Sequence, residues 1–480
     1  MQPNADAALA ARRQQRVTFA VLAVSVSAFA LLQSLIVPVL ARIQVEYDTD
    51  QSTVTWVLTA YLLSASIATP LLGRIGDAVG KKRMLVITMS ALAVGSLAAA
   101  LAPSIGWLIA ARVVQGLGGG VLPLSFGIIR DEFGEKMTGA LSVLASLTAV
   151  GFGFGIVIAG PIVETLGYHW LFWLLMGITA VAAVAALVLI PTSPRGEAQR
   201  VPVLPAVLLA GWLTALLLPV SQGNAWGWGS PRVVGLLAVS AVLMAVWARA
   251  EVRARVPLID MTMMRRRGVW TTNVVTLFVG FGLFASFGFL PQLLATPVES
   301  GYGFGASITE SGRLLLPSAV ASFVVGFLTA RLMGRFGSRA VIVTGTVISA
   351  LSYAAIALLH ETTTQLLVGI TAQGLGTGLV ISSSAAVVIA SVPPEQTGVA
   401  SGMNANIRTI GGSIGSAVMA GIVTAHLGAD GFPVERGYTV GFLVLAIGLV
   451  IASVAALRIP DLHRTRPAAV TSPEPVATSR

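Results

Sequence analysis

The chain has 480 residues, of which 55% are hydrophobic and only 10% are charged, and its mean hydropathy is +0.85. A soluble domain typically carries about 25% charged residues, so this composition excludes an ordinary water-exposed surface and predicts a protein embedded in lipid. The net charge of +10 is compatible with nucleic-acid binding. However, the basic residues lie between apolar segments, which favours a membrane over a nucleic-acid partner.

Apolar segments bounded by charged residues, Pro and Gly predict fourteen transmembrane helices and an all-α polytopic membrane fold. The first segment, 17–41, is too long for the hydrophobic region of a cleavable signal peptide and long enough to cross a bilayer. The predicted helices lie at 17–41, 54–74, 84–103, 106–129, 138–163, 170–191, 203–220, 231–248, 268–294, 312–333, 340–360, 365–392, 399–426 and 437–457.

These helices predict two six-helix halves with a pair of helices inserted between them. The expected divisions are an N-tail (1–16), an N-terminal half (17–191), two inserted helices with a linker (192–267), a C-terminal half (268–457) and a C-tail (458–480). Both tails are expected to be disordered.

The basic residues predict the orientation of the chain. If the N-terminus is cytoplasmic, 24 of the 30 Lys and Arg residues fall in cytoplasmic tails or loops, four fall in outer loops, and two, Arg112 and Arg408, fall within helices. This is the asymmetry of the positive-inside rule. It favours a multi-pass protein of the plasma membrane with both termini in the cytoplasm.

The two halves are related by a sequence repeat at an offset of 257–258 residues. The residues at 115–118 (QGLG) recur at 373–376, and the segment 73–82 is echoed by 330–339. Two repeated halves that rock about a central site are a recurrent design of secondary transporters. The repeat therefore predicts a transporter of a small organic solute, which we expect to act as a monomer surrounded by lipid.

The loop after the second predicted helix carries Gly73, Arg74, Asp77, Gly80 and Lys82. This spacing resembles the signature loop of the major facilitator superfamily, in which the acid contacts a helix of the other half and latches the outward-open state. The resemblance implies that role for Asp77, with Arg74 and Lys82 at the basic positions. A merely basic loop that orients the chain is the alternative. The segment departs from the phosphate-binding loop pattern, so an ATP-driven pump is not supported.

Two arginines lie within predicted helices. Arg112 with Gln115 and Gly116 resembles the Arg-bearing motif of the same superfamily, which implies a role in proton transfer or substrate handling. A guanidinium inside the bilayer is costly and is functional by default, whereas snorkelling to the membrane surface is the alternative. Arg408 is a candidate for transport on the same grounds.

The fifth predicted helix contains Gly151, Gly155, Gly160 and Pro161. The spacing resembles the motif of the superfamily's drug antiporters, although Gly-Pro comes later than in the usual form and a Gly pair is missing. Close packing of helices through small residues is the alternative. Together with the inserted helices and the segment at 56–63 (WVLTAYLL), the whole chain resembles the fourteen-span drug:proton antiporter branch.

Proton coupling is implied by this resemblance and not by a carboxylate in the middle of a predicted helix. The branch commonly carries an Asp in its first helix where this chain has Gln33, which cannot titrate. Glu310 is a candidate for proton coupling, with a local ion pair to Arg313 as the alternative. The four His residues are scattered over helix ends and the tail and the chain has no Cys, so we expect neither a metal site nor a cofactor.

Polar residues at mid-span predict the lining of a substrate cavity: Gln33, Asn273, Gln292 and Gln373, to which Phe281 adds an aromatic surface. A packing role for the Phe residues of this helix is equally open. We therefore expect an exporter of hydrophobic or amphipathic drugs or antibiotics that exchanges them for protons.

The same sequence is compatible with other directions of transport. A proton-coupled importer or an uncoupled facilitator would have the same fold, and both alternatives stay open. An intramembrane hydrolase is not supported. The GGSIG segment at 411–415 matches a hydrolase pattern but lies within an apolar helix, without the strand–turn–helix setting that this pattern needs.

Overall fold

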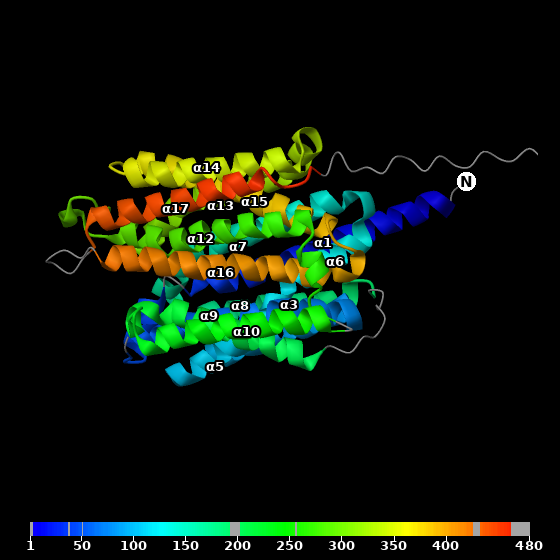
Figure 1. Cartoon of the computed structure of the whole chain (residues 1–480), viewed down its shortest axis with the longest axis horizontal. Coiled ribbons are helices and arrows are strands. Elements are labelled where there is room, and N and C mark those ends of the chain that lie inside the picture. Colours follow the sequence, from blue (N-terminus) through cyan, green and yellow to red (C-terminus); the bar gives the residue numbers. More distant parts are fainter. Residues whose placement is uncertain are drawn as a thin grey trace, which may run out of the picture.

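The computed structural model describes residues 3–36, 39–49, 51–192, 202–254, 257–425 and 433–461. The regular elements of these residues are helices, and the longest run side by side (Figure 1). The α-helices are α1 (Pro3–Leu35), α2 (Leu40–Glu46), α3 (Gln51–Val79), α4 (Lys81–Ala100), α5 (Ile105–Gly116), α6 (Val121–Phe133), α7 (Met137–Leu166), α8 (His169–Leu189), α9 (Val203–Trp226), α10 (Pro231–Arg253), α11 (Met261–Met264), α12 (Arg267–Ala295), α13 (Ile308–Phe336), α14 (Ser338–Leu358), α15 (Thr363–Ala390), α16 (Thr397–Thr424) and α17 (Glu435–Ala456). Four short 3₁₀ helices are η2 (Leu117–Gly120), η3 (Gly134–Lys136), η4 (Val298–Ser300) and η5 (Pro394–Gln396).

Fourteen spans in the described part of the chain are long and apolar enough to cross a bilayer, which confirms the predicted number and the fold class. One of them is composite: α5, η2 and α6 form a single span with a 3₁₀ turn at its centre. Glycine at this turn lets α3 come close, since a Cβ on Gly120 would lie 2.8 Å from the Cβ of Leu72.

The first helix differs from the prediction. α1 begins at Pro3, so residues 3–16 are helical, and the prediction of a disordered N-tail is wrong for them. Two side-chain amides bind this extension to the ends of α8 and α6: Gln14 donates to the carbonyl of Leu189 (2.7 Å) and Gln15 to that of Glu132 (2.8 Å). Most of the predicted C-tail, from 462 onward, lies outside the described residues, as do 193–201 and 255–256 of the predicted linker.

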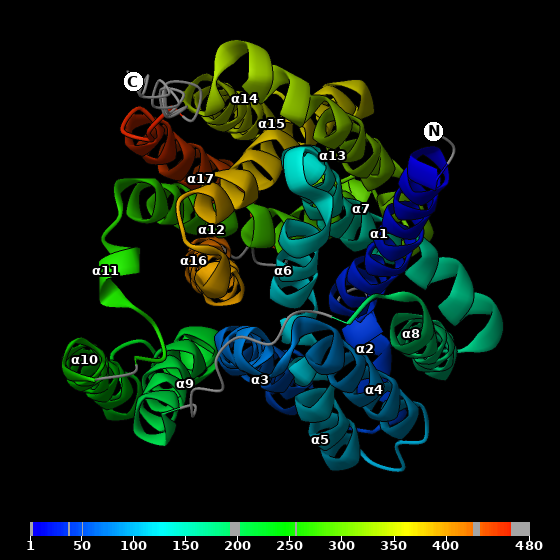
Figure 2. The ribbon, with the colours of Figure 1, turned by 90° about the vertical axis from the view of Figure 1, so that its right-hand side faces the viewer.

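The helices before and after the inserted pair form two packed groups. α1 and α3–α8 contact one another, α12–α17 do likewise, and the groups meet where α7 packs on α13 and α3 on α16 (Figure 2). Small residues allow the α7–α13 approach, because a Cβ on Gly153 would overlap Ala319 and one on Gly326 would overlap Ser146.

The inserted helices lie against the junction between the groups. α9 packs on both α3 and α16, and α10 packs on α9 (Figure 2). Trp212 of α9 and Trp247 of α10 belong to a buried apolar cluster that includes Val399 of α16. Past the end of α10, the backbone N–H groups of Leu258 (2.8 Å) and Ile259 (3.3 Å) donate to the carboxylate of Glu251. The pair is therefore fixed beside the junction of the two groups.

Candidate functional site

Asp77 lies at the end of α3 and contacts the first turn of α16. Its Oδ2 accepts hydrogen bonds from the backbone N–H groups of Gly398 (3.1 Å) and Val399 (3.4 Å). The first N–H groups of a helix have no partner within the helix, so a carboxylate is well placed to bind them. The contact joins the two helix groups at one end of the bundle, which we call the latch end.

The cation beside Asp77 is Lys81 of α4. Its Nζ lies 3.7 Å from Oδ1 of Asp77 and 2.9 Å from Oδ2 of Asp131 on α6. Both Asp77 and Lys81 are at least nine-tenths buried. Sequence reasoning chose Lys82 and missed the Lys81–Asp131 pair. The spacing of the loop fixes the type of residue but does not show which of two adjacent lysines faces the carboxylate.

Arg130 makes a second contact between the groups at the latch end. Its guanidinium donates to the carbonyls of Ile389 (2.9 Å) and Val392 (2.8 Å) and to the hydroxyl of Thr397 (2.6 Å). One α6 side chain thus binds the final turn of α15 and the start of α16. Sequence reasoning missed this residue, although Arg130 directly precedes Asp131 at the charged end of its helix.

Arg112 and Gln115 are buried within the first helix group. The Nε of Arg112 donates to the carbonyl of Val57 (3.0 Å) and its Nη1 to Oε1 of Gln115 (2.9 Å). Gln115 in turn donates to Ser96 (2.9 Å), and the guanidinium lies 4.3 Å from the centre of the Tyr61 ring. Arg112 therefore binds groups of α3 and α5 through Nε and Nη1 and does not snorkel, while its buried Nη2 has no hydrogen-bond partner among the described residues.

Three neighbouring cavities lie along one face of α12. The α9 cavity, of about 340 Å³, is lined by α3, α9, α12 and α16. The Arg408 cavity, of about 50 Å³, lies between α1, α6 and α7 on one side and α12, α15 and α16 on the other. The Gln373 cavity, of about 20 Å³, lies among α7, α12, α13 and α15. Phe284 borders the first two, and Leu283 and Phe287 border the last two, so the cavities form a row between the helix groups.

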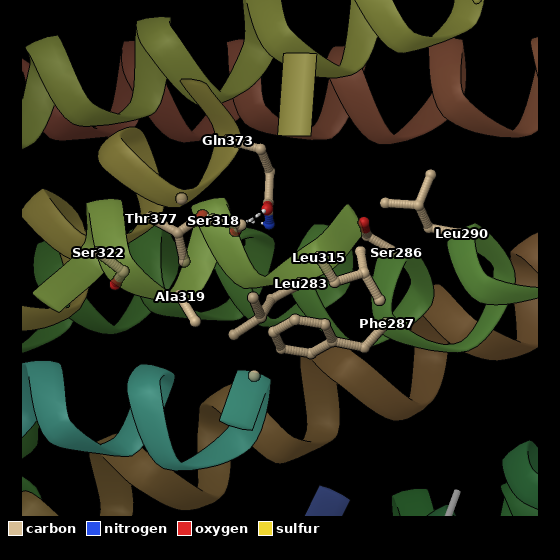
Figure 3. A pocket seen from close by; sticks show the side chains of 12 residues that line it. Leu283, Ser286, Phe287, Leu290, Leu315, Ser318, Ala319, Ser322, Gln373 and Thr377 are labelled. Atoms are coloured by element: carbon tan, nitrogen blue, oxygen red, sulfur yellow. Dashed lines mark hydrogen bonds between the residues drawn. The ribbon is translucent and has the colours of Figure 1, made fainter. Parts of the chain in front are cut away.

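The Gln373 cavity has a polar side on α13 and α15. Figure 3 shows the hydrogen bond between Gln373 and Ser318 on this polar side, with Leu283 and Phe287 of α12 on the apolar side of the cavity. Oε1 of Gln373 accepts from Ser318 (3.1 Å), and its Nε2 donates to the hydroxyl of Tyr353 (3.2 Å). Gln373 is the repeat equivalent of Gln115, but only Gln373 reaches one of these three cavities.

A model of the Major Facilitator Superfamily matches residues 22–296 and again residues 272–478. The chain belongs to the major facilitator superfamily. This confirms the family predicted from the loop at 73–83, and the fourteen candidate spans fit its fourteen-span branch.

Relatives within the superfamily are similar over most of their length. The tetracenomycin C resistance and export protein of Streptomyces glaucescens is 27% identical over 427 residues, which cover 87% of this chain and 77% of that protein. The multidrug resistance protein Stp of Mycobacterium tuberculosis (strain ATCC 25618 / H37Rv) is 29% identical, covering 83% and 74%. The multidrug transporter protein MdtP of Bacillus subtilis (strain 168) is 25% identical, covering 78% and 70%.

The fold is also that of a solved superfamily transporter. The human organic anion transporter MFSD10 (TETRAN) superposes with a TM-score of 0.65, covering 93% of this chain and 99% of that one. The two sequences are 17% identical, so the likeness concerns the fold alone.

The cavities of this superfamily member bring together some of the predicted site residues. Gln33 and Arg408 line the Arg408 cavity, and Gln373 lines its own. Asn273 is buried away from the three cavities, where its Oδ1 accepts from Nδ2 of Asn404 (2.8 Å) and joins α12 to α16.

Gln292 and Phe281 were expected in the cavity lining and do not line these three cavities. Gln292 is exposed near the end of α12. Phe281 faces α17, where a Cβ on Gly448 would lie 3.2 Å from its ring. Phe284 and Phe287 border the cavities, whereas Phe281, one turn before Phe284, packs against α17 instead.

Glu310 is exposed at the start of α13, away from the three cavities. It forms a capping box with Ser307, accepting from the N–H of Ser307 (2.8 Å) while its own N–H donates to the Ser307 hydroxyl (3.2 Å). Its geometry is that of a helix cap.

The glycines of α7 face two different helices. A Cβ on Gly151 would lie 2.7 Å from that of Ala30 on α1, and one on Gly155 would overlap Ser34 of the same helix. A Cβ on Gly160 would lie 2.6 Å from Oγ1 of Thr309 on α13. Pro161 follows within α7 without ending it. This segment therefore holds α7 between α1 and α13.

Proposed function

We propose that this protein exports hydrophobic or amphipathic small molecules, drugs or antibiotics among them, across the plasma membrane in exchange for protons. It acts as a monomer with both termini in the cytoplasm. Relatives named for multidrug resistance and for tetracenomycin C export support drug efflux.

The observation that carries the proposal is the α9 cavity at the junction of the helix groups. Its volume, about 340 Å³, lies in the range of small-molecule sites, which are mostly apolar with a few polar groups. Leu58, Leu62 and Phe284 supply apolar surface, while Ser221 and Thr409 supply hydroxyls. Such a lining favours amphipathic molecules.

Contacts at the latch end control whether the cavities are open to the cytoplasm. Asp77 and Arg130 close the helix groups on one another at the end that the basic residues predict to be cytoplasmic. This conformation is therefore closed towards the cytoplasm, and opening towards it requires both contacts to break. Alternating access follows if the two groups rock about the row of cavities.

The proposal is tested by transport into inverted membrane vesicles, using a panel of dyes and antibiotics with and without an imposed pH gradient. Uptake that needs the gradient, releases protons from the vesicle and stops with a protonophore supports antiport. A panel that does not move under any gradient would remove the export function.

One observation favours an uncoupled facilitator as a second candidate. Gln33 lines the Arg408 cavity at a position where its branch commonly carries an Asp, and the residues that line the three described cavities include no Asp or Glu. Substrate movement indifferent to the pH gradient would support this candidate and retire antiport.

A further inference from the structure

Arg408 differs from the other arginine of the membrane interior in having no partner. Arg112 is fully buried and hydrogen-bonded to the α3 backbone and to Gln115. Arg408 lies midway along α16 and lines a cavity, and within the described part of the chain its side chain has no hydrogen bond or ion pair. A charge at this depth is costly unless something binds it, and the cavity is the place where a ligand can do so.

The rest of the Arg408 cavity suits a small anionic group. Gln33 faces it from α1, and its amide likewise has no hydrogen-bond partner among the described residues. Thr148 faces it from α7 and is the remaining polar residue of the lining. Its other walls are apolar, including Phe29, Leu122 and Ile381. Guanidinium and amide N–H donors in an apolar enclosure bind a carboxylate or phenolate strongly, because charge-assisted hydrogen bonds are strengthened where water is excluded.

The size and position of the neighbouring cavity indicate where the rest of such a molecule lies. At about 50 Å³ the Arg408 cavity holds a head group and little more. The α9 cavity is about 340 Å³ and shares Phe284 with the Arg408 cavity, and its lining includes Thr409, the next residue after Arg408. Because the two cavities share this wall residue, the body of a molecule with an anionic head at Arg408 is expected to extend beside Phe284 towards the α9 cavity.

We infer that the substrates of this transporter are amphipathic organic anions, whose acidic group binds Arg408 and Gln33 while the apolar body occupies the α9 cavity. This inference rests on the proposed export function and names its substrate class. It gives Arg408 the role of a specificity-determining residue and leaves Arg112 a structural one.

Three probes with one ring system and different charge test the inference: pyrenebutyrate, its neutral methyl ester, and pyrenebutyl-trimethylammonium. Their dissociation constants are measured by fluorescence with the full-length protein in lipid nanodiscs. The wild type is expected to bind the carboxylate about tenfold or more tightly than the ester. Arg408→Gln is expected to remove that difference by weakening carboxylate binding alone, and Arg408→Lys to restore part of it.

Arg436→Gln is the matched control, because Arg436 is an exposed arginine at the start of α17 and its loss changes net charge equally. It is expected to bind all three probes like the wild type. A wild type that binds the ester or the ammonium probe as tightly as the carboxylate overturns the inference. So does an Arg408→Gln protein that weakens all three probes equally.

Transport separates the two proposals. Uptake of the carboxylate probe by inverted vesicles, lost in Arg408→Gln, supports both. Export of the neutral or cationic probe without preference for the anion leaves drug efflux standing and removes only the anion site. Failure to export any probe or any member of the drug panel removes both.

Discussion

The carboxylate of Asp77 accepts a hydrogen bond of 3.1 Å from the backbone N–H of Gly398, 321 residues further along the chain. Glycine at both ends of the contact makes it possible: a Cβ on Gly73 would lie 2.6 Å from the carbonyl oxygen of Gly398, and one on Gly398 would lie 2.8 Å from Asp77 Oδ2. α3 and α16 can approach this closely only while the latch end is closed. The bond is therefore specific to one conformation, and weakening it shifts the balance between conformations.

Asp77→Asn is expected to favour opening at the latch end. Hydrogen bonds to a charged group contribute about 1.5–3 kcal/mol, and an amide keeps the acceptor but loses the charge, so we expect about a tenfold shift in the population ratio. The chain has no native Cys, so spin labels at Val79→Cys and Leu457→Cys report the distance between the two groups directly. Longer distances should gain population in the Asn variant.

Glu132→Gln is the control for that experiment, since Glu132 is another acid near the same end and its carboxylate makes no described contact with the other helix group. Its distance distribution should match that of the wild type. An unchanged distribution in Asp77→Asn, with transport also unchanged, would remove Asp77 from the latch.

Arg130→Lys is expected to weaken the same end although the charge is kept. The guanidinium contacts three carbonyl oxygens and one hydroxyl at 2.6–3.3 Å, which a single ammonium group cannot reach together. The same pair of spin labels should show more opening than in the wild type. Combining Arg130→Lys with Asp77→Asn should give less than the sum of the two shifts, because both contacts hold one interface. Strict additivity would show that they act independently.

Arg112→Leu is expected to lower stability and leave probe affinity intact. Removing the guanidinium leaves Oε1 of Gln115 without its donor, and one such buried orphan costs about 1–3 kcal/mol; the Val57 carbonyl loses its second donor but stays within the hydrogen-bonding pattern of α3. Thermal unfolding in detergent should show a lower Tm, whereas the folded fraction should bind pyrenebutyrate normally. A variant with normal Tm and no probe binding would return Arg112 to the substrate site.

The sequence predicted the latch loop but only part of what it contacts. The resemblance of the loop with Gly73, Asp77 and Gly80 to the superfamily's signature loop implied a cross-half contact, and Asp77 makes one. The contacts of Lys81 and Arg130 were not predicted. Lys81 pairs with Asp131, and Arg130 binds carbonyls near 389–393, and only folding brings these partners close. Periodic hydrophobicity was enough to find the fourteen spans, since each span is a local property of the chain.

The cavity lining was harder to predict from single residues. Gln33 and Gln373 border cavities, while Asn273 instead joins two helices through Asn404. A polar residue at mid-span signals a partner of some kind, and both a neighbouring helix and a ligand satisfy that requirement. The contribution of α9 to a cavity could not be foreseen, because the sequence does not show where an inserted pair docks.

Gly151→Val is expected to disturb the packing of α7 on α1. The added Cβ would lie 2.7 Å from Ala30, and overpacking of this kind costs about 1–3 kcal/mol. Thermal unfolding is the measurement, and Gly177→Val is the matched control, because nothing lies within 4 Å of a Cβ built at Gly177 on α8. Equal Tm values for both variants would contradict the packing role of Gly151.

Val220→Trp tests whether the inserted helix α9 forms part of the binding site. Val220 is 7% exposed and lines the α9 cavity, so an indole there fills space that the body of a large ligand needs. Binding of pyrenebutyrate should weaken about tenfold or more, whereas the smaller naphthalenebutyrate should bind almost as well as to the wild type. Leu204→Trp, at a position of α9 that is 64% exposed, is the control for adding an indole to this helix.

The size dependence is what separates a cavity wall from a purely structural helix. If α9 only braces α3 and α16, Val220→Trp lowers the affinity for both probes by the same factor, through damage to the bundle. If α9 forms the wall, the loss grows with the volume of the ligand, because the cavity shrinks while the head-group contacts at Arg408 are untouched. The ratio of the two dissociation constants, measured in the same preparation, decides between these outcomes.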